Sequence, residues 1–173
     1  ETTLTDIRIT YGQITDWQLV TPQRTIALLI SPQITPDIAD ILRETINAQN
    51  IVTTLNIAGS QPLAPAAPVT VSMRTRLANI GYPDGISVVI GHASIPSITL
   101  IEAQLNTANI TSNLQPLTID DTLSRLNSGA LQLGIHFWTT PEERQSWVAA
   151  LGDTNVIDLF TLPLSYTANA DIV

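Results

Sequence analysis

The sequence of 173 residues contains no lysine, so seven arginines carry all of its side-chain positive charge. Charged residues make up only 13% of the chain, about half of the share that is usual in soluble domains. Lysine and glutamate are depleted where proteins contact one another, whereas arginine is retained there. The lack of lysine therefore favours a subunit whose surface is covered by copies of itself or by other partners.

Cysteine is also absent, which excludes disulfides, thiolate catalysis and zinc–thiolate sites. The net charge of −8 argues against a nucleic-acid partner, because nucleic-acid binding needs a basic surface. Apolar runs reach only five residues, as in Ile26–Ile30, so we expect no transmembrane segment. We expect no cofactor and no metal site either.

Most of the chain shows period-two alternation in short runs that are rich in isoleucine, valine and threonine, a pattern typical of half-buried strands. The predicted strands are 4–11, 13–20, 25–31, 51–58, 69–77, 86–91, 97–105, 131–138 and 155–167. The polar stretch 106–117 fits either a strand or a loop. The proline-rich stretch 59–68 predicts an extended surface loop.

Three segments predict helices. In 36–48, apolar residues recur at helical spacing after a threonine N-cap and a proline. A second helix is expected over 119–127, between Thr118 and Gly129. The sequence from Thr140 to Glu143 is a capping box that opens a third helix, which ends at Gly152.

Eight to ten strands with about three short helices in the connections predict an all-β fold, an antiparallel β-sandwich of the jelly-roll type. Strands and helices do not alternate regularly along the chain, which makes a βαβ arrangement the less favoured alternative. No repeat, linker or change of composition divides the chain, so we expect 1–173 to form a single domain.

The chain has few groups that could perform catalysis. His92 follows a predicted strand without a nucleophile-elbow pattern, and His136 has no second metal ligand at a useful spacing. The carboxylate pairs Asp120-Asp121 and Glu142-Glu143 lie in first turns of predicted helices, where the helix dipole favours negative charge. The sequence therefore predicts that the protein is not an enzyme.

The polar face of the strand 131–138 carries Gln132, His136 and Trp138. A tryptophan beside a histidine and an amide suits a sugar platform. It suits equally an anchor at a subunit contact, where tryptophan and arginine dominate. A covering helix of the same chain could also bury Trp138, and this third interpretation is the most favoured of the three.

Arg74 and Arg76 share the polar face of another predicted strand, which suggests a carboxylate-rich partner surface. Pro62 and Leu63 lie in the uncharged loop and suit a contact, although a rigid spacer explains them as well. The candidate interface residues are Arg74, Arg76, Pro62, Leu63, Gln132, His136 and Trp138.

In size, strand pattern and low surface charge, the chain resembles the single-jelly-roll major capsid proteins of tailless, membrane-containing icosahedral phages. The resemblance concerns the architecture alone and rests on no motif. It implies a self-assembling coat subunit of a virion, whose partners are copies of itself as a dimer or larger and a second capsid protein. The alternative is a secreted carbohydrate-binding or adhesin-type β-sandwich module.

Overall fold

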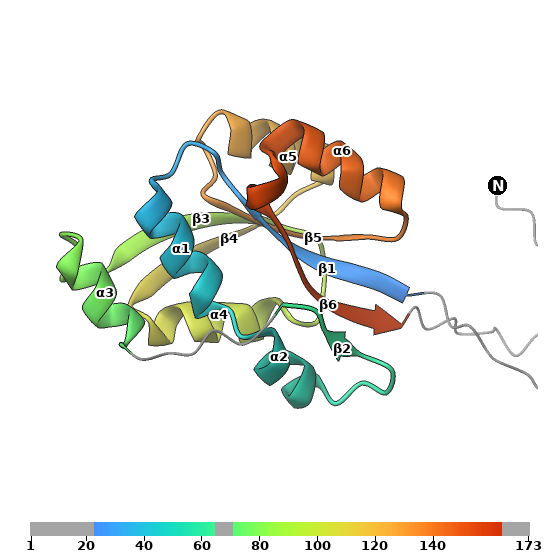
Figure 1. Cartoon of the computed structure of the whole chain (residues 1–173), viewed down its shortest axis with the longest axis horizontal. Helices are drawn as coiled ribbons and strands as arrows, with labels where there is room; N and C mark the ends of the chain where they lie inside the picture. Colours follow the sequence, from blue (N-terminus) through green and yellow to red (C-terminus); the bar gives the residue numbers. More distant parts are fainter. Residues whose placement is uncertain (1–22, 65–70, 164–173) are drawn as a thin grey trace, which may run out of the picture.

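The computed structural model describes residues 23–64 and 71–163, and these form a six-stranded mixed sheet with helices on both faces (Figure 1). The strands are β1 (Gln23–Ile30), β2 (Gln61–Pro62), β3 (Ile86–His92), β4 (Ile110–Pro116), β5 (Leu133–Trp138) and β6 (Val156–Pro163). Their order across the sheet is β2-β6-β1-β5-β3-β4. The strand β3 runs parallel to both of its neighbours, whereas β1 is antiparallel to β5 and β6.

Six α-helices fill the connections between these strands. They are α1 (Pro36–Thr45), α2 (Ala48–Leu55), α3 (Met73–Asn79), α4 (Ile98–Thr107), α5 (Ile119–Asn127) and α6 (Pro141–Leu151). The helices α1 to α4 lie on one side of the sheet and α5 and α6 on the other (Figure 1). In the part of the chain that the structure describes, no helix has the length and apolar character needed to cross a membrane.

The central strand β1 contributes to a hydrophobic core on each side of the sheet. Ile26, Leu28 and Ile30 pack with α1 to α4, whereas Ala27 and Leu29 pack with α5 and α6. Successive residues of a strand point to opposite faces, so a strand covered on both faces is apolar throughout. This burial explains why 25–31 reads as a central strand in the sequence.

The prediction of an all-β jelly roll is wrong. Segments 51–58, 69–77 and 97–105, all predicted to be strands, lie largely in α2, α3 and α4. The physical reason is that residues four apart share a face in a helix and in a strand alike. Met73 and Leu77 are such a pair. Both lie on the buried face of α3, and their spacing produced the apparent alternation in the sequence.

The preference against a βαβ arrangement is wrong too, because β3, α4 and β4 form a parallel strand–helix–strand crossover. The ambiguous stretch 106–117 contains β4. Helices over 119–127 and after Thr140 are confirmed as α5 and α6. The predicted strands 4–11 and 13–20 lie outside the described residues, and the single domain over 1–173 stays a prediction.

Candidate ligand-binding sites

The carboxyl ends of β3, β4 and β5 meet at one edge of the sheet, because these three strands are parallel. The chain leaves β3 toward α4 on one face and leaves β5 toward α6 on the opposite face. Two adjacent parallel strands whose connections part in this way form a topological switch point. Ligands of open α/β sheets bind in the crevice outside the carboxyl ends at such points.

A cavity of about 420 Å³ opens at this edge between β5, α5 and α6. We call it the α5/α6 cavity. It is lined by Ala93, Leu117, Thr118, Ile119, Asp120, Leu123, His136, Phe137, Glu143, Ser146 and Trp147. Ala93 and Leu117 directly follow β3 and β4, so the cavity lies at the switch point. Its volume and its mainly apolar wall are those of a small-molecule site.

Two glycines bring α5 close to the sheet at this cavity. Gly91 of β3 and Gly134 of β5 are register partners, and Thr122 of α5 sits over both. A Cβ atom added at Gly134 would lie 2.7 Å from Thr122 Cγ2, and one at Gly91 would lie 2.9 Å from Thr122 Oγ1. The absence of side chains at both positions thus allows Thr122 to pack directly against β3 and β5.

His136 is the buried polar residue of this cavity, with only 4% of its surface exposed. Its Nε2 lies 2.9 Å from Thr122 Oγ1. Burial, together with the nearby His92, lowers the pKa of His136 to about 4. Because water cannot solvate a charged imidazole here, the ring is neutral at physiological pH.

The mouth of the cavity is formed by two capped helix N-termini. Thr118 accepts a hydrogen bond from the backbone of Asp121 at 3.2 Å, and Thr140 and Glu143 form a capping box at α6. Backbone N–H groups, first that of Thr139 and then that of Thr140, hold the pKa of Glu143 below its ordinary value. The Glu143 carboxylate is therefore charged and fixed in orientation.

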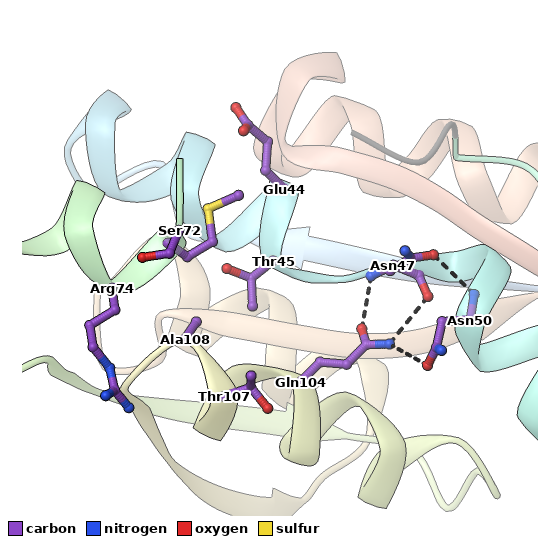
Figure 2. Close-up of a pocket in the computed structure, with 10 residues that line it drawn as sticks. Glu44, Thr45, Asn47, Asn50, Ser72, Arg74, Gln104, Thr107 and Ala108 are labelled. Carbon is purple, nitrogen blue, oxygen red and sulfur yellow. Dashed lines mark hydrogen bonds between the residues drawn. The ribbon is translucent and has the colours of Figure 1, made fainter. Parts of the chain in front are cut away.

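A second hollow, the α1–α4 groove, has a volume of about 380 Å³ and lies on the opposite face of the sheet (Figure 2). It is lined by Glu44, Thr45, Asn47, Asn50, Ser72, Met73, Arg74, Gln104, Thr107 and Ala108. Its lining therefore holds more amides and hydroxyls than the α5/α6 cavity. It also lies away from the carboxyl ends of the parallel strands.

The amides of the α1–α4 groove bond one another. Gln104 Oε1 accepts from the backbone N–H of Asn47 at 2.8 Å, and Gln104 Nε2 donates to the Asn47 carbonyl and to Asn50 Oδ1 (Figure 2). Asn47 also accepts from the backbone of Asn50 at 2.9 Å, which caps α2. These contacts tie α4 to the junction of α1 and α2, which is a structural role.

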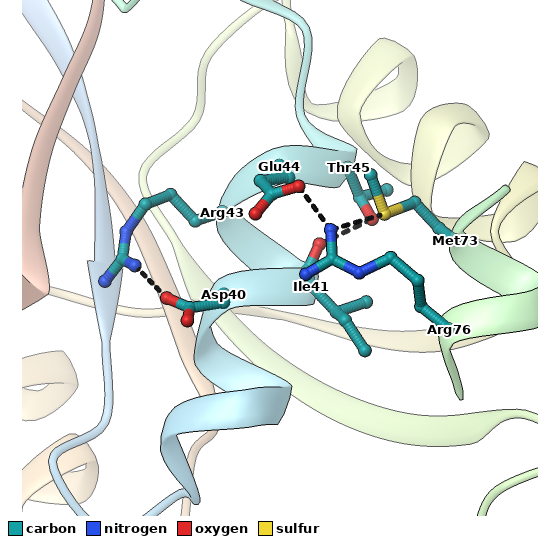
Figure 3. A network of polar contacts seen from close by, with 7 residues as sticks. All are labelled: Asp40, Ile41, Arg43, Glu44, Thr45, Met73 and Arg76. Atoms are coloured by element: carbon teal, nitrogen blue, oxygen red, sulfur yellow. Dashed lines mark hydrogen bonds and ion pairs between the residues drawn. The ribbon is translucent and has the colours of Figure 1, made fainter. Parts of the chain in front are cut away.

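The two arginines predicted on a strand face both lie on α3. Arg76 donates to Glu44 of α1 and lies 3.6 Å from Met73 Sδ (Figure 3). Its carboxylate partner is thus in the same chain. Arg74 lines the α1–α4 groove and is exposed. The structure does not bring Arg74 or Arg76 to the α5/α6 cavity.

The remaining sequence candidates scatter over the fold. Trp138 packs against the core under α6 and its indole N–H donates to Asp158 at 2.8 Å, so its contacts are within the chain. Gln132 accepts from the backbone of Val89 at 2.8 Å. Pro62 pairs with β6, and Leu63 next to it is 48% exposed. Of the three polar-face residues, only His136 lines the cavity, and a role of these residues in protein contacts stays a prediction.

Sequence reasoning missed Thr122, Gly91 and Gly134 as parts of one site. The two glycines have a weak local signal, because a glycine inside a strand pattern marks a close approach of another backbone or side chain. Thr122 has no such signal. What the sequence could not supply is the pairing of β3 with β5, which places the two glycines side by side under α5.

Comparisons with known proteins give no match among protein-family models and none among curated protein sequences. Solved structures do match, and three of them, all at low identity, are described below. The periplasmic binding protein DppA of Helicobacter pylori, solved with the peptide STSA, is 16% identical with a TM-score of 0.53, over 76% of this chain and 30% of that one. NikA of Staphylococcus aureus, solved with Ni(L-His)2, is 17% identical with a TM-score of 0.53, over 76% and 31%.

A third neighbour, the binding protein AgaA with agropinic acid, from A. tumefacien R10, is 11% identical with a TM-score of 0.52, over 83% of this chain and 46% of that one. The chain thus spans less than half the length of these solved structures. The likeness shows that the chain shares part of the fold of solute-binding proteins.

The resemblance to phage capsid proteins is therefore wrong, because the structural neighbours are mixed α/β binding proteins and not jelly rolls. The expectations of a coat subunit, a virion location, and partners that are copies of itself or a second capsid protein are overturned with it. The neighbours are described as binding proteins, which is closer to the alternative of a secreted binding module than to a capsid. That alternative was wrong in its β-sandwich architecture.

Proposed function

We propose that this chain is a solute-binding module that acts outside the cytoplasm and serves a transporter of the ABC type. The observation that carries the proposal is the α5/α6 cavity at the switch point of the sheet, where α/β proteins bind ligands. The fold neighbours support it, because their described ligands include peptides, a nickel–histidine complex and an opine.

Binding rather than catalysis is the function that the cavity chemistry supports. Its one buried titratable group is neutral at physiological pH, and its only lining carboxylates are Asp120 at the mouth and Glu143, which is held by the capping box. A polar group fixed in an apolar wall gives orientation and specificity to a bound molecule. The neighbours point in the same direction, since DppA and a further neighbour from Borrelia burgdorferi are described as binding proteins.

The test is a thermal-shift screen followed by calorimetry on the whole chain. The solutes are short peptides including STSA, agropinic acid, and nickel with L-histidine. A solute at a hundred times its Kd stabilises the protein by about 2.7 kcal/mol, which raises the Tm by roughly 5–10 °C in a domain of this size. If no solute of the panel raises the Tm or releases heat, the proposed function is wrong.

Two matched variants locate the site. Ser146 and Thr107 are exposed helix residues whose hydroxyls donate to backbone carbonyls of the preceding turn, at 2.7 and 2.9 Å. Ser146→Trp fills the α5/α6 cavity and Thr107→Trp fills the α1–α4 groove. We expect the first variant to abolish binding and the second to leave it unchanged. The reverse result would move the site to the groove.

A further inference from the structure

The hydrogen-bond network of His136 fixes which of its ring nitrogens carries the proton. The hydroxyl of Thr122 donates its single proton to the carbonyl of Thr118, at 2.9 Å. Thr122 Oγ1 therefore accepts from His136, so Nε2 is the protonated nitrogen of the neutral ring. The other nitrogen, Nδ1, then has a lone pair and acts as a hydrogen-bond acceptor.

This acceptor has no partner in the part of the chain that the structure describes. Across residues 23–64 and 71–163, the one hydrogen bond of the His136 side chain is that from Nε2 to Thr122. His136 as a residue is 4% exposed, and it lines the α5/α6 cavity. Nδ1 is not among the fully buried side-chain atoms of the described residues that lack a partner, so it is not sealed from solvent. An acceptor that no neighbouring group satisfies, on a residue that lines a cavity, is open to a donor of a bound molecule.

The charges around the cavity also favour a ligand that donates hydrogen bonds, because they are mainly negative. The charged lining residues are the acidic Asp120 and Glu143, and Asp121 and Glu142 lie beside them in the same first turns. Four carboxylates outweigh the two helix N-termini, which supply about half a positive charge each.

The basic groups on the surrounding elements have other partners. Arg144 of α6 pairs with Asp158, Arg125 of α5 donates to Gln115, and the ring of His92 bonds the Ala93 carbonyl. Arg144, Arg125 and His92 are not among the residues that line the cavity. A cation or a neutral N–H donor is therefore accepted at this mouth more readily than an anion.

We propose that the α5/α6 cavity binds a small ligand with an apolar body and an amine or other N–H donor, which donates a hydrogen bond to Nδ1 of His136. The inference rests on the proposed function and names the ligand class of that same site. Leu117, Leu123 and Trp147, which belong to the core on the α5/α6 face, hold the apolar body. The low pKa of His136 keeps Nδ1 an acceptor at every pH above about 4.

The test compares two probes of similar size and opposite charge, phenethylamine and 3-phenylpropionate, by calorimetry at pH 7. We expect the amine to bind at least tenfold more tightly than the carboxylate. If phenethylamine does not bind, or the carboxylate binds as tightly, the inference is overturned. Solute binding from the wider screen would still stand in that case, so the two failures are distinguishable.

Two substitutions separate the ring nitrogens. The amide nitrogen of Gln reaches the place of Nε2, so His136→Gln keeps the donor to Thr122 and removes the acceptor at Nδ1. The shorter Asn places its amide oxygen near Nδ1, so His136→Asn keeps an acceptor there. We expect a loss of tenfold or more in phenethylamine affinity for His136→Gln and a smaller loss for His136→Asn. Equal affinity of His136→Gln and wild type would overturn the proposal.

A measurement on the wild type tests the proposal even if the variants fail to fold. Long-range proton–nitrogen NMR distinguishes a protonated from an unprotonated ring nitrogen. We expect His136 to show the Nε2–H form at pH 7, with an Nδ1 resonance that shifts when phenethylamine is added. An Nδ1–H form, or an Nδ1 resonance that does not respond to bound amine, contradicts the inference.

Discussion

The two hollows of this molecule have similar volumes, about 420 Å³ for the α5/α6 cavity and about 380 Å³ for the α1–α4 groove. They differ in how their polar atoms are used. In the groove, the amides of Asn47, Asn50 and Gln104 bond one another and hold helices together. In the cavity, Nδ1 of His136 has no partner among the described residues. Polar lining whose groups bond one another is thus a weaker sign of a binding site than one polar atom at a cavity wall that lacks a partner.

The largest expected effect is the pH dependence of folding stability that His136 in the α5/α6 cavity produces. In the unfolded chain the imidazole takes up a proton near pH 6.5, whereas in the folded chain it does so only near pH 4. Between these values the unfolded state binds more protons, so stability falls as the pH falls, by about 3 kcal/mol in total. Urea unfolding of wild type and His136→Gln at pH 7, 6, 5 and 4 measures this.

The variant should lose little stability between pH 6.5 and 4.5, because it has no group that titrates at this position. Glu143, whose pKa is lowered by its capping bonds, adds a loss in the same direction at the acid end in both proteins. Parallel pH profiles of wild type and variant would show that His136 is not held neutral by the fold.

The next effect concerns the close approach of α5 to the sheet. Gly134→Ala places a Cβ 2.7 Å from the Cγ2 atom of Thr122, and such overpacking costs about 1–3 kcal/mol. Thr122→Ser removes that methyl group and keeps the hydroxyl that bonds His136. We therefore expect the double variant to recover part of the stability that Gly134→Ala loses, as measured by urea unfolding. Strictly additive losses would contradict the packing that we describe.

A smaller effect compares the helix caps of the two faces. Thr140 caps α6 with its hydroxyl, whereas Thr35 precedes α1 without a side-chain cap hydrogen bond. Thr140→Ala should cost about 1 kcal/mol, and Thr35→Ala should stay within about 0.5 kcal/mol. Thermal unfolding of the two variants side by side checks this. Equal losses of stability would mean that the two caps do not differ.

The smallest effect is expected from the ion pair between Arg76 and Glu44 on the groove side. Their side chains are 31% and 36% exposed, so solvent and salt screen the attraction. A double-mutant cycle with Arg76→Ala and Glu44→Ala should give a coupling of about 0.2–1 kcal/mol that falls with added salt. A coupling well above this range would mean that the ion pair near the α1–α4 groove stabilises the protein as much as the packing of α5 on the sheet does.

The sequence predicted well the elements whose boundaries carry their own chemistry. Capping residues and glycines marked α5 and α6, and the continuous apolar run of β1 marked a strand covered on both faces. It failed where apolar residues are four apart, as at Ile101 and Leu105 of α4, because this spacing fits helix and strand equally. Reading three helices as strands turned an α/β sheet into a jelly roll.

The candidate site was foreseen only in part. His136 stood out beside Trp138 on one strand face, and a covering helix was the favoured interpretation of that face. Its partner Thr122 is fourteen residues away in sequence, and the contact depends on which strands are neighbours. Strand order is set by long-range packing, which local patterns do not encode.

The most direct test of the account is to map where a bound amine sits by amide chemical shifts during a titration with phenethylamine. The account predicts that the perturbed amides cluster around His136, Leu123 and Trp147 in the α5/α6 cavity, while those around Asn47 and Gln104 in the α1–α4 groove stay unchanged. Perturbations confined to the groove, or none in the cavity at saturating amine, would contradict it.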